Sequence, residues 1–541
     1  MTEHPFRLDR SRAALALEAC ASAARASSLR QQFSQDPDRF KRFSCSADGI
    51  LLDYSKQRID AATMTALFEL AEESGLRTGI DAMLTGAHVN STEDRPALHC
   101  AARLFEHTPP EARAESAKTL SQLQTFVRKI HSGALAGSTG KPIMHVVHIG
   151  IGGSDLGPRL VYEALIPSVT LKLRVSFAAN VDETEIRSIL DNANPAETLF
   201  IVASKSFSTI ETLSNAHLAR QWLVEGLGEQ AGLSHHFVAI SNNTAAARQF
   251  GIAEHAIFAM PEWIGGRFSV WSAIGLPLML AFGTEVFDEF LAGGRSMDTH
   301  FANVPFQSNL PVILGLLGIW NASFLEIGSH AVLAYSHRLR NLPAHLQQLE
   351  MESNGKSVDK NGRSVSWQTA PILFGGTGTV GQHAYHQLFY QGTRQVALDF
   401  VLPVESGHSP AARNLLNNAL AQSAALMLGR SLDEAQRELA AGGHPESEVI
   451  RLAPHLVCPG NQPSSTLLMP PVNAFSVGQL LALFEHKVFV QGWIWGINCF
   501  DQYGVELGKN MARSMPTRTG AQQDSSTAGL LAAIESMSET H

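Results

Sequence analysis

The chain has 541 residues, of which 45% are hydrophobic and 17% charged, and its formal net charge is −9. Since this length exceeds what one hydrophobic core usually serves, we expect two domains. The acidic balance, without a block of lysine or arginine, argues against nucleic acid or an anionic membrane surface as the main partner. Any anionic ligand must therefore be met by a local site.

The chain has five cysteines, Cys20, Cys45, Cys100, Cys458 and Cys499. They are widely spaced and never form a CxxC pair, which indicates free thiols in a reducing compartment and neither a disulfide scaffold nor a zinc site. The N-terminus lacks the pattern of a signal peptide, and the longest apolar stretch, residues 474–500, is interrupted by Glu485-His486-Lys487. We expect a soluble cytoplasmic protein.

The first part of the chain, residues 1–112, is mostly helix-patterned, and we expect it to pack on the larger of the two domains. From Lys141 the pattern changes to short apolar runs that alternate with amphipathic helices. The runs are PIMHVVHIG, LKLRVSFAA, TLFIVA, HFVAI and HAIFAM. Strands and helices in alternation imply parallel pairing with right-handed crossovers, so we predict a smaller α/β domain over residues 113–283.

A second set of predicted strands follows, in the runs HAVLAYS, APILFGG, QVALDFVLP and TLLMPPV. Helices are expected near residues 341–355, 379–391, 410–428 and 475–499. They predict a larger α/β domain over 284–513, followed by a tail, 514–541. The predicted fold is thus two α/β sandwich domains with mainly parallel sheets flanked by helices, and a ligand cleft is expected near the carboxyl ends of the strands.

One stretch between a predicted buried strand and a predicted helix carries five hydroxyl side chains and a lysine, Ser204-Lys-Ser-Phe-Ser-Thr-Ile-Glu-Thr212. Side-chain donors, free backbone N–H groups and the positive end of the helix dipole can hold a phosphate there. The alternative is an N-cap cluster in which Ser208 or Thr209 caps the helix. The stretch by itself is compatible with both.

Two glycine loops raise the question of a nucleotide. The first, Gly150-Ile-Gly-Gly-Ser-Asp-Leu-Gly157, is neither GxGxxG nor a P-loop, but it places Gly153 and Ser154 where the backbone can approach a ligand. The second, GTGTVG over residues 376–381, matches GxGxxG and has Asp399 downstream. On motif grounds, a nicotinamide-dependent dehydrogenase is therefore a competing hypothesis.

The helix predicted after the second glycine loop carries His383, His386 and Gln387 on one face. Titratable side chains at these positions favour chemistry over the packed apolar helix of a cofactor fold. The two histidines could also be metal ligands or ordinary hydrogen-bonded histidines. Since no carboxylate lies beside them at metal-ligand spacing, we predict no metal site.

On the helix predicted over residues 341–355, His345, Gln348 and Glu352 share a face, while Glu350 points elsewhere. In one interpretation Glu352 forms an exposed pair with the lysine four residues later, worth only ~0.3 to 0.5 kcal/mol. In the other, it is a base beside an amide that binds substrate hydroxyls.

Arg267 stands in a glycine turn just before a very apolar helix-patterned run, where a held guanidinium suits a phosphate or an oxyanion. A structural ion pair at the helix cap is the alternative. Near the end of the chain, Gln502 and Lys509 lie in a polar insertion between helices that helix packing does not require.

Taken together, these stretches resemble the glucose-6-phosphate isomerase family from about residue 40 to Arg513. The matching stretches, in the family's order, are TEDRPALH, GIGGSDLGP, SKSFSTIET, GGRFSVWSAIG, QLEMESNGK with GGTGTVGQHAYHQL, and FDQYGVELGK. Departures are small: Ser206 and Ser208 stand where threonine is common in the family, which keeps each hydroxyl, and GKNMA replaces the more usual GKQLA.

The resemblance implies an aldose–ketose isomerase of glycolysis and gluconeogenesis that acts on glucose 6-phosphate and fructose 6-phosphate. It implies that Glu352 is the base between C2 and C1, that Arg267 stabilises the cis-enediolate, and that His383 and Lys509 assist ring opening. The substrate-binding residues it implies are Gly153, Ser154, Ser204, Lys205, Ser206, Thr209, Thr212, Gln348 and Gln502.

Members of the family are homodimers that use neither metal nor nucleotide. The resemblance therefore implies a homodimer here, in which His383 reaches the site of the partner subunit. It also implies that the GxGxxG turn serves only to start the helix that carries His383. A non-catalytic sugar-phosphate-binding protein is the alternative; it would keep the hydroxyl-rich stretch but would need none of Glu352, His383 and Lys509, all of which are present.

Overall fold

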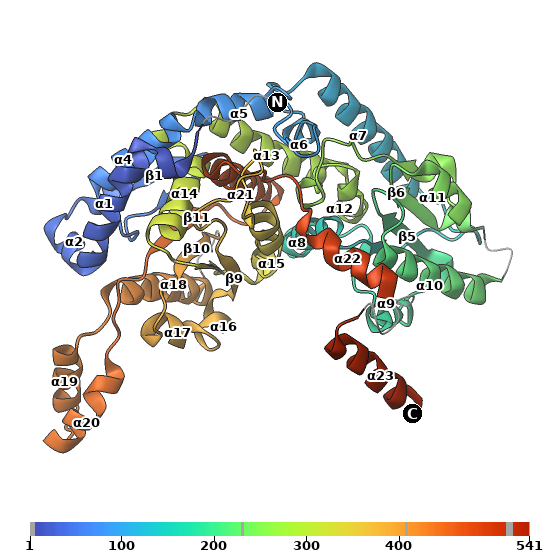
Figure 1. The fold of residues 1–541 in the computed structure, drawn as a ribbon. Helices are drawn as coiled ribbons and strands as arrows, with labels where there is room; N and C mark the ends of the chain where they lie inside the picture. The colour runs from blue at the N-terminus through green and yellow to red at the C-terminus, as the bar shows by residue number, and fades with distance from the viewer. Residues whose placement is uncertain (1–5, 229–231, 406–408, 516–522, 540–541) are drawn as a thin grey trace. The chain divides into compact units, whose positions relative to one another are not determined.

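A computed structural model describes residues 6–228, 232–405, 409–515 and 523–539. Contacts divide the chain into two compact units, Met1–Cys499 and Phe500–His541. The first unit holds both sheets and nearly all helices (Figure 1). The predicted fold class, α/β with mainly parallel sheets flanked by helices, is confirmed.

The five-stranded sheet contains every strand predicted in the first set. Its order is β4-β3-β5-β6-β7, and every neighbouring pair is parallel. The strands are β3 (His145–Ile149), β4 (Arg174–Ala178), β5 (Thr198–Ala203), β6 (Phe237–Ile240) and β7 (Ile257–Phe258). Each residue of β3, β5 and β6 is buried, as expected for strands covered by helices on both faces.

The six-stranded sheet contains every strand predicted in the second set. Its order is β1-β2-β11-β10-β8-β9. The strands are β1 (Ser44–Ala47), β2 (Ile50–Asp53), β8 (Ser329–Ala334), β9 (Ile372–Thr377), β10 (Ala397–Pro403) and β11 (Ser464–Met469). Strands β8 to β11 pair in parallel, whereas β1 and β2 form an antiparallel hairpin whose second strand pairs antiparallel with β11.

The N-terminal part is mostly helical, as predicted, and the hairpin is an addition that the prediction lacked. Its turn is Asp48-Gly49, and both residues have positive φ, 47° and 87°. Asp-Gly is a strong signal for a two-residue hairpin turn, so the sequence contained this information. The two sheets otherwise fall within the predicted ranges, and the bounds of the domains themselves stay a prediction.

The helices before the first sheet are α1 (Arg12–Ala26), α2 (Leu29–Gln35), α3 (Arg39–Arg42), α4 (Ala61–Glu73), α5 (Leu76–Leu84), α6 (His99–Ala102) and α7 (Pro110–His131). Those among and after the strands of the five-stranded sheet are α8 (Leu156–Leu165), α9 (Glu183–Leu190), α10 (Ile210–Leu227), α11 (Thr244–Phe250) and α12 (Leu276–Phe282). Helices α10 and α12 both pack against β3.

The remaining helices of the first unit are α13 (Thr284–Asn303), α14 (Leu310–Ile319), α15 (Leu342–Leu346), α16 (Gly378–Gln382), α17 (His386–Gln391), α18 (Pro410–Leu428), α19 (Leu432–Ala441), α20 (Glu446–Leu456) and α21 (Ala474–Trp495). Helices α19 and α20 form a helical hairpin (Figure 1). The predicted helices at 410–428 and 475–499 correspond to α18 and α21.

Helix α21 is buried on all sides and packs against α13 and α14. Only Phe475 and Trp493 among its residues are partly exposed. Despite this apolar character, no helix among the described residues is long and apolar enough to cross a membrane.

Two expectations about local structure were wrong. The helix expected over 379–391 is broken into α16 and α17, because the chain leaves the helical path at His383. The apolar run after Arg267 does not start a helix at once: Arg267 lies in a 3₁₀ turn (Gly266–Phe268), and α12 begins only at Leu276, where Pro277 suits the first helical turn.

The second unit contains α22 (Gly504–Ser514) and α23 (Ser525–Glu539). Helix α23 lies within the predicted tail, 514–541. Residues 516–522 and 540–541 of the predicted tail lie outside the described part of the chain.

Candidate active site

The candidate site begins at the carboxyl ends of β3 and β5, which are parallel neighbours. From β3 the chain continues to β4 on one side of the sheet, whereas from β5 it continues to β6 and β7 on the other side. Such a topological switch point leaves a crevice at the carboxyl ends of the strands, where α/β proteins bind ligands. Residues 152–154 follow β3, and the hydroxyl-rich stretch follows β5. The carbonyl of Ser154 accepts a hydrogen bond from Nε2 of His148, 2.7 Å away, and burial lowers the pKa of this histidine to about 4.

The hydroxyl-rich stretch is a compact loop whose side chains bond to one another. The hydroxyl oxygens of Ser204 and Thr209 are 3.1 Å apart, and those of Ser206 and Ser208 are 2.6 Å apart. Between them, Phe207 has a φ of 49° and a buried ring. Because a positive φ costs a bulky residue energy, the burial of Phe207 must hold the loop in this conformation.

The N-terminus of α10 offers donors to a ligand. Thr209 is its N-cap residue, yet in the described part of the chain its side chain makes no capping hydrogen bond. Thr212, in the first turn, is 2% exposed, and its hydroxyl has no hydrogen-bond partner among the described residues. The first backbone N–H groups of a helix have no partner within the helix, so this end is suited to an anion. The N-cap alternative is not supported.

Lys205 connects this loop to the segment that leads to Arg267. Its Nζ donates to the carbonyls of Glu262 and Ile264, at 3.1 and 3.4 Å, and lies 3.2 Å from the carboxylate of Glu262. Burial lowers the pKa of Lys205, while Glu262 opposes this shift. Asn243 donates to the carbonyl of Ser206 from the loop after β6. Lys205 therefore braces the loop, and direct contact with a substrate stays a prediction.

Glycines allow the loop after β3 to lie directly on the Arg267 turn. A Cβ on Gly153 would lie 2.1 Å from the carbonyl oxygen of Gly266 and 2.5 Å from the nitrogen of Arg267. A Cβ on Gly152 would lie 3.0 Å from Nε2 of Gln348. The predicted residues Gly153 and Gln348 are thus brought to one place with Arg267.

Arg267 is 3% exposed and is held from two directions. Its Nε donates to Oγ of Ser353 at 2.6 Å, and its Nη2 donates to the carbonyl of Cys499 at 2.7 Å. Its Nη1 lies 3.7 Å from Oε1 of Glu352. The guanidinium is therefore oriented before any ligand binds, with one nitrogen directed toward the Glu352 carboxylate.

Glu352 ends a π-helical turn, η11 (Gln347–Glu352), which continues α15. Such turns are rare and occur frequently at functional sites. The Glu352 side chain is 22% exposed, so it is not the solvated surface residue of the alternative interpretation. Lys356 donates to the backbone carbonyls of Glu352 and Ser353. As predicted, Glu350 points away, and it bonds to α21.

His383 and His386 do not share a face, which corrects the prediction. His383 follows the last residue of α16 and is exposed, whereas His386 is 2% exposed and has Nδ1 3.2 Å from the side-chain oxygen of Gln422. The break between α16 and α17 turns the two side chains apart. Neither lies among the contacts that join Arg267 to Glu352.

Lys509 and Gln502 belong to the second unit. Lys509 lies on α22 and donates to Oε1 of Glu506 at 2.8 Å, and Gln502 is half-buried ahead of this helix. Their roles stay predictions.

The GxGxxG turn is used for packing. Gly378 lies against the ring of Tyr335, where a Cβ would come within 2.4 Å of ring carbon. Asp399, the residue that would bind a ribose in a dinucleotide site, is 4% exposed and lies 2.9 Å from Nε2 of His330. A carboxylate that is buried against His330 is not available to a nucleotide, so the dehydrogenase hypothesis is not supported.

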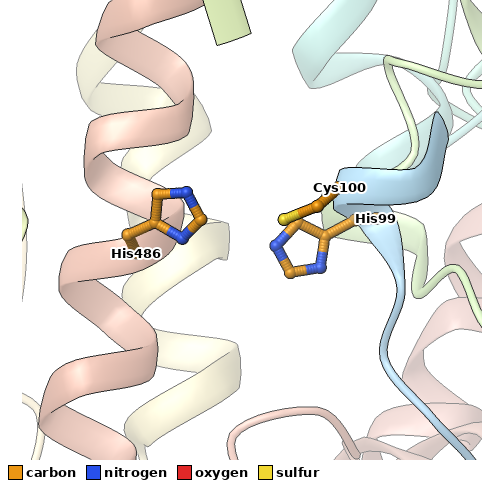
Figure 2. A group of neighbouring side chains, drawn as sticks. All are labelled: His99, Cys100 and His486. Carbon is orange, nitrogen blue, oxygen red and sulfur yellow. The ribbon is translucent and has the colours of Figure 1, made fainter. Parts of the chain in front are cut away.

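One buried group in the described part of the chain has metal-ligand side chains, His99 and Cys100 on α6 and His486 on α21, with candidate atoms within 4.8 Å of one another. Figure 2 shows the two sides facing each other. Burial raises the pKa of the Cys100 thiol, and Nη2 of Arg103 lies 3.1 Å from its sulfur. A protonated thiol beside a guanidinium is a poor cation ligand, so the group belongs to a buried charge network.

Sequence reasoning missed several residues that shape the site: Glu262, Ser353 and the pair of Glu350 with Lys487. Ser353 directly follows Glu352 and offered no pattern of its own. The charged interruption of an apolar stretch at residues 485–487 was a usable signal, because charges inside a buried helix need partners.

Two mainly parallel sheets, a helix N-terminus at a switch point with no side-chain cap among the described residues, and a carboxylate beside a buried guanidinium are the features of an α/β enzyme for an anionic substrate. The sequence model of the phosphoglucose isomerase family matches residues 53–531. The chain belongs to the phosphoglucose isomerase family.

Named relatives agree over nearly the whole chain. The glucose-6-phosphate isomerase of Aromatoleum aromaticum is 54% identical over 525 residues, covering 97% of this chain and 96% of the relative. That of Hahella chejuensis is 48% identical, covering 93% of this chain and 92% of the relative. The crystal structure of a glucose-6-phosphate isomerase from Chlamydia trachomatis matches with a TM-score of 0.86 at 31% identity, covering 98% of this chain and all of the other.

Proposed function

We propose that this enzyme reversibly converts D-glucose 6-phosphate to D-fructose 6-phosphate, through ring opening and a cis-enediol intermediate, in glycolysis and gluconeogenesis. The observation that carries the proposal is the position of the Glu352 carboxylate, 3.7 Å from the buried guanidinium of Arg267. Relatives that are about half identical over nearly the full chain carry the name of this activity.

Aldose–ketose conversion moves one proton between neighbouring carbons on the same face of the substrate. One carboxylate can accept the proton from C2 and return it to C1, which is the role we assign to Glu352. The oxygen that gains charge needs a cation already in place, and Arg267 meets this need because Ser353 and Cys499 hold it.

The far end of the sugar carries a phosphate, which we assign to the loop of Ser204, Ser206, Thr209 and Thr212 and to the backbone N–H groups that begin α10. Among the described residues, the buried hydroxyl of Thr212 has no hydrogen-bond partner and α10 has no side-chain cap, and both observations support this assignment. Gly153, Ser154, Gln348 and Gln502 would line the rest of the pocket, and Lys205 would hold the loop against the Arg267 segment.

Ring opening needs a proton acceptor and a donor at the ring oxygen and the anomeric hydroxyl, work that suits a histidine near neutral pH. We assign it to His383, with Lys509. We also propose that the enzyme is a homodimer and that His383 serves the site of the partner subunit. Exposed apolar side chains close to His383 in the sequence, Val380 at 67% and Leu388 at 48%, support a surface that another copy covers.

The proposed chemistry needs no metal and no cofactor, and the substrate is the only small molecule we assign. Nucleic acid and membrane have no part in it. Five free cysteines support a cytoplasmic location.

A direct assay with purified protein tests the function. We expect interconversion of the two sugar phosphates without added metal or NAD, and we expect Glu352→Gln to lower kcat by at least ~100-fold, since it removes the base and keeps its shape. Sugar-phosphate binding without turnover in the parent protein would instead favour the non-catalytic alternative.

Co-expression of Glu352→Gln with His383→Ala tests the contribution across subunits. If His383 acts in the partner's site, each mixed dimer has one site with both residues intact, and random pairing restores about a quarter of the parent's sites. The two variants purified separately and left unmixed are the control. No recovery on co-expression would place His383 in its own subunit's site.

A further inference from the structure

Helix α21 carries three consecutive ionisable residues, Glu485, His486 and Lys487, in its buried middle. They are 1%, 0% and 1% exposed. Successive residues of a helix point about 100° apart, so the three side chains leave the helix toward different neighbours. Buried charges are costly unless each has a partner, and each of these three has one.

Glu485 holds the segment that follows Arg267. Its Oε1 accepts a hydrogen bond from Nε1 of Trp271 at 2.7 Å, and its Oε2 accepts one from Nη1 of Arg103 at 2.6 Å. Burial raises the pKa of Glu485 to about 7, while Arg103 and Trp271 oppose this shift. Trp271 also stacks on Phe290, with ring centroids 4.4 Å apart. The stretch that carries Arg267 is therefore tied to the middle of α21.

Lys487 holds the turn that carries Glu352. Its Nζ donates to Oε2 of Glu350 at 2.8 Å, and both side chains are almost fully buried. Glu350 lies in the same π-helical turn as Glu352. Just beyond the turn, Asn354 donates to the carbonyl of Val488, also on α21, at 3.1 Å.

His486 fixes the helix between these two ties. Its Nε2 lies 2.8 Å from Oδ1 of Asp298 on α13, and its ring stacks on Phe301 with centroids 4.1 Å apart. Arg103 joins Asp298 to Glu485, since Nε donates to Asp298 at 2.8 Å. The middle of α21 is thus held in one position by α13 and by Arg103, the residue that follows α6.

We propose that Glu485-His486-Lys487 is a positioning element: from one buried helix it sets the distance between Arg267 and Glu352. The inference rests on the proposed function, because it assigns the reacting roles to those two residues. Apolar side chains of similar size would fill the same helix without the cost of desolvating charges. What apolar side chains cannot do is tie two separate turns to one helix in a single geometry.

The Lys487 tie is tested by Glu350→Met together with Lys487→Met. Removing both partners avoids the lone buried charge that a single substitution would leave, which is strongly destabilising. We expect kcat to fall roughly 10- to 100-fold while KM changes less than about threefold, because a small misplacement of a catalytic group mainly affects the chemical step.

The Glu485 tie is tested by Trp271→Phe, which removes the indole N–H and keeps an aromatic ring on Phe290. We again expect a loss in kcat and little change in KM. When both ties are broken in one protein, the combined loss of kcat should be smaller than the product of the two separate losses. Breaking either tie alone already allows the distance between Arg267 and Glu352 to vary, so the second break adds little.

The matched control is Gln479→Met. Gln479 lies on the same helix, is equally buried, and donates to the carbonyl of Asp48 and to Ser296, neither of which belongs to the Arg267 or Glu352 turn. We expect its kcat to equal that of the parent. All proteins are assayed at temperatures where thermal unfolding shows them folded.

Any one of four results would overturn the proposal. They are a kcat equal to that of the parent in both tie variants, a change confined to KM, an equal loss of kcat in the Gln479→Met control, and a combined loss equal to the product of the two separate losses. These outcomes differ from failure of the proposed function, in which the parent protein itself would show no isomerase activity.

Discussion

The hydroxyl-rich loop, Ser204 to Thr212, and the pair of Arg267 and Glu352 are built in opposite ways. The loop is one continuous stretch at the start of one helix, and its hydroxyls bond mainly to one another. The pair joins residues far apart in the chain: Arg267 bonds to Ser353, 86 residues later, and to Cys499, 232 residues later.

This difference predicts how each region responds to change. A helix N-terminus offers several equivalent donors, so the loss of one hydroxyl leaves the other donors to bind an anion. The guanidinium has one orientation, given by two hydrogen bonds from distant segments. We therefore expect changes in the loop to affect mainly binding, and changes in the pair to have larger effects, on turnover.

The largest effect is expected for Arg267→Lys. A lysine keeps the charge but cannot bond to Ser353 and Cys499 while it also faces Glu352, so we expect kcat to fall ~100- to 1000-fold. Steady-state kinetics in both directions measure it. Glu254, an exposed residue paired with Arg248, provides the control Glu254→Gln, which should behave as the parent does. A lysine variant with a kcat close to that of the parent would show that turnover does not need the hydrogen bonds of the guanidinium to Ser353 and Cys499.

An intermediate effect is expected for Ser204→Ala combined with Thr209→Ala. Removal of two hydroxyls that we assign to the phosphate should raise KM about 10- to 100-fold and leave kcat nearly unchanged. Inhibition by inorganic phosphate should weaken in parallel. If kcat falls and KM does not, the loop takes part in the chemical step and the comparison between the two regions fails.

The smallest effect is expected for the stability of Thr209→Ala. An N-cap threonine usually contributes ~1 kcal/mol, but this hydroxyl bonds to Ser204 and not to α10, so we expect a change below about 0.5 kcal/mol in the free energy of unfolding. Urea denaturation measures it. Ser431 is the matched control, because it forms a complete capping box with Glu434 on α19, and Ser431→Ala should cost ~1 kcal/mol. Equal costs for both substitutions would show that Thr209 caps α10 after all.

Much of the fold could be predicted from local patterns. All nine predicted strands are present, because short apolar runs between helical patterns have few other structures open to them. The hydroxyl-rich loop was also visible, since its hydroxyls, its strand and its helix are neighbours in the sequence; its binding of a phosphate stays a prediction. The Asp48-Gly49 hairpin was missed although its turn signal was present, and the break at His383 was missed because helical spacing was extended through a turn.

The sequence by itself determined the strands, the helix N-terminus that offers donors to an anion, and the presence of Glu352, Arg267, His383 and Lys509. Residue type gives each of these side chains its charge and acid–base character, while their catalytic roles were implied by the family resemblance and stay predictions. Only the tertiary structure decided that Arg267 faces Glu352, that Lys205 braces the loop, and that Glu485 and Lys487 hold two separate turns. These contacts join segments from distant parts of the chain, and no local pattern encodes which buried charge will meet which partner.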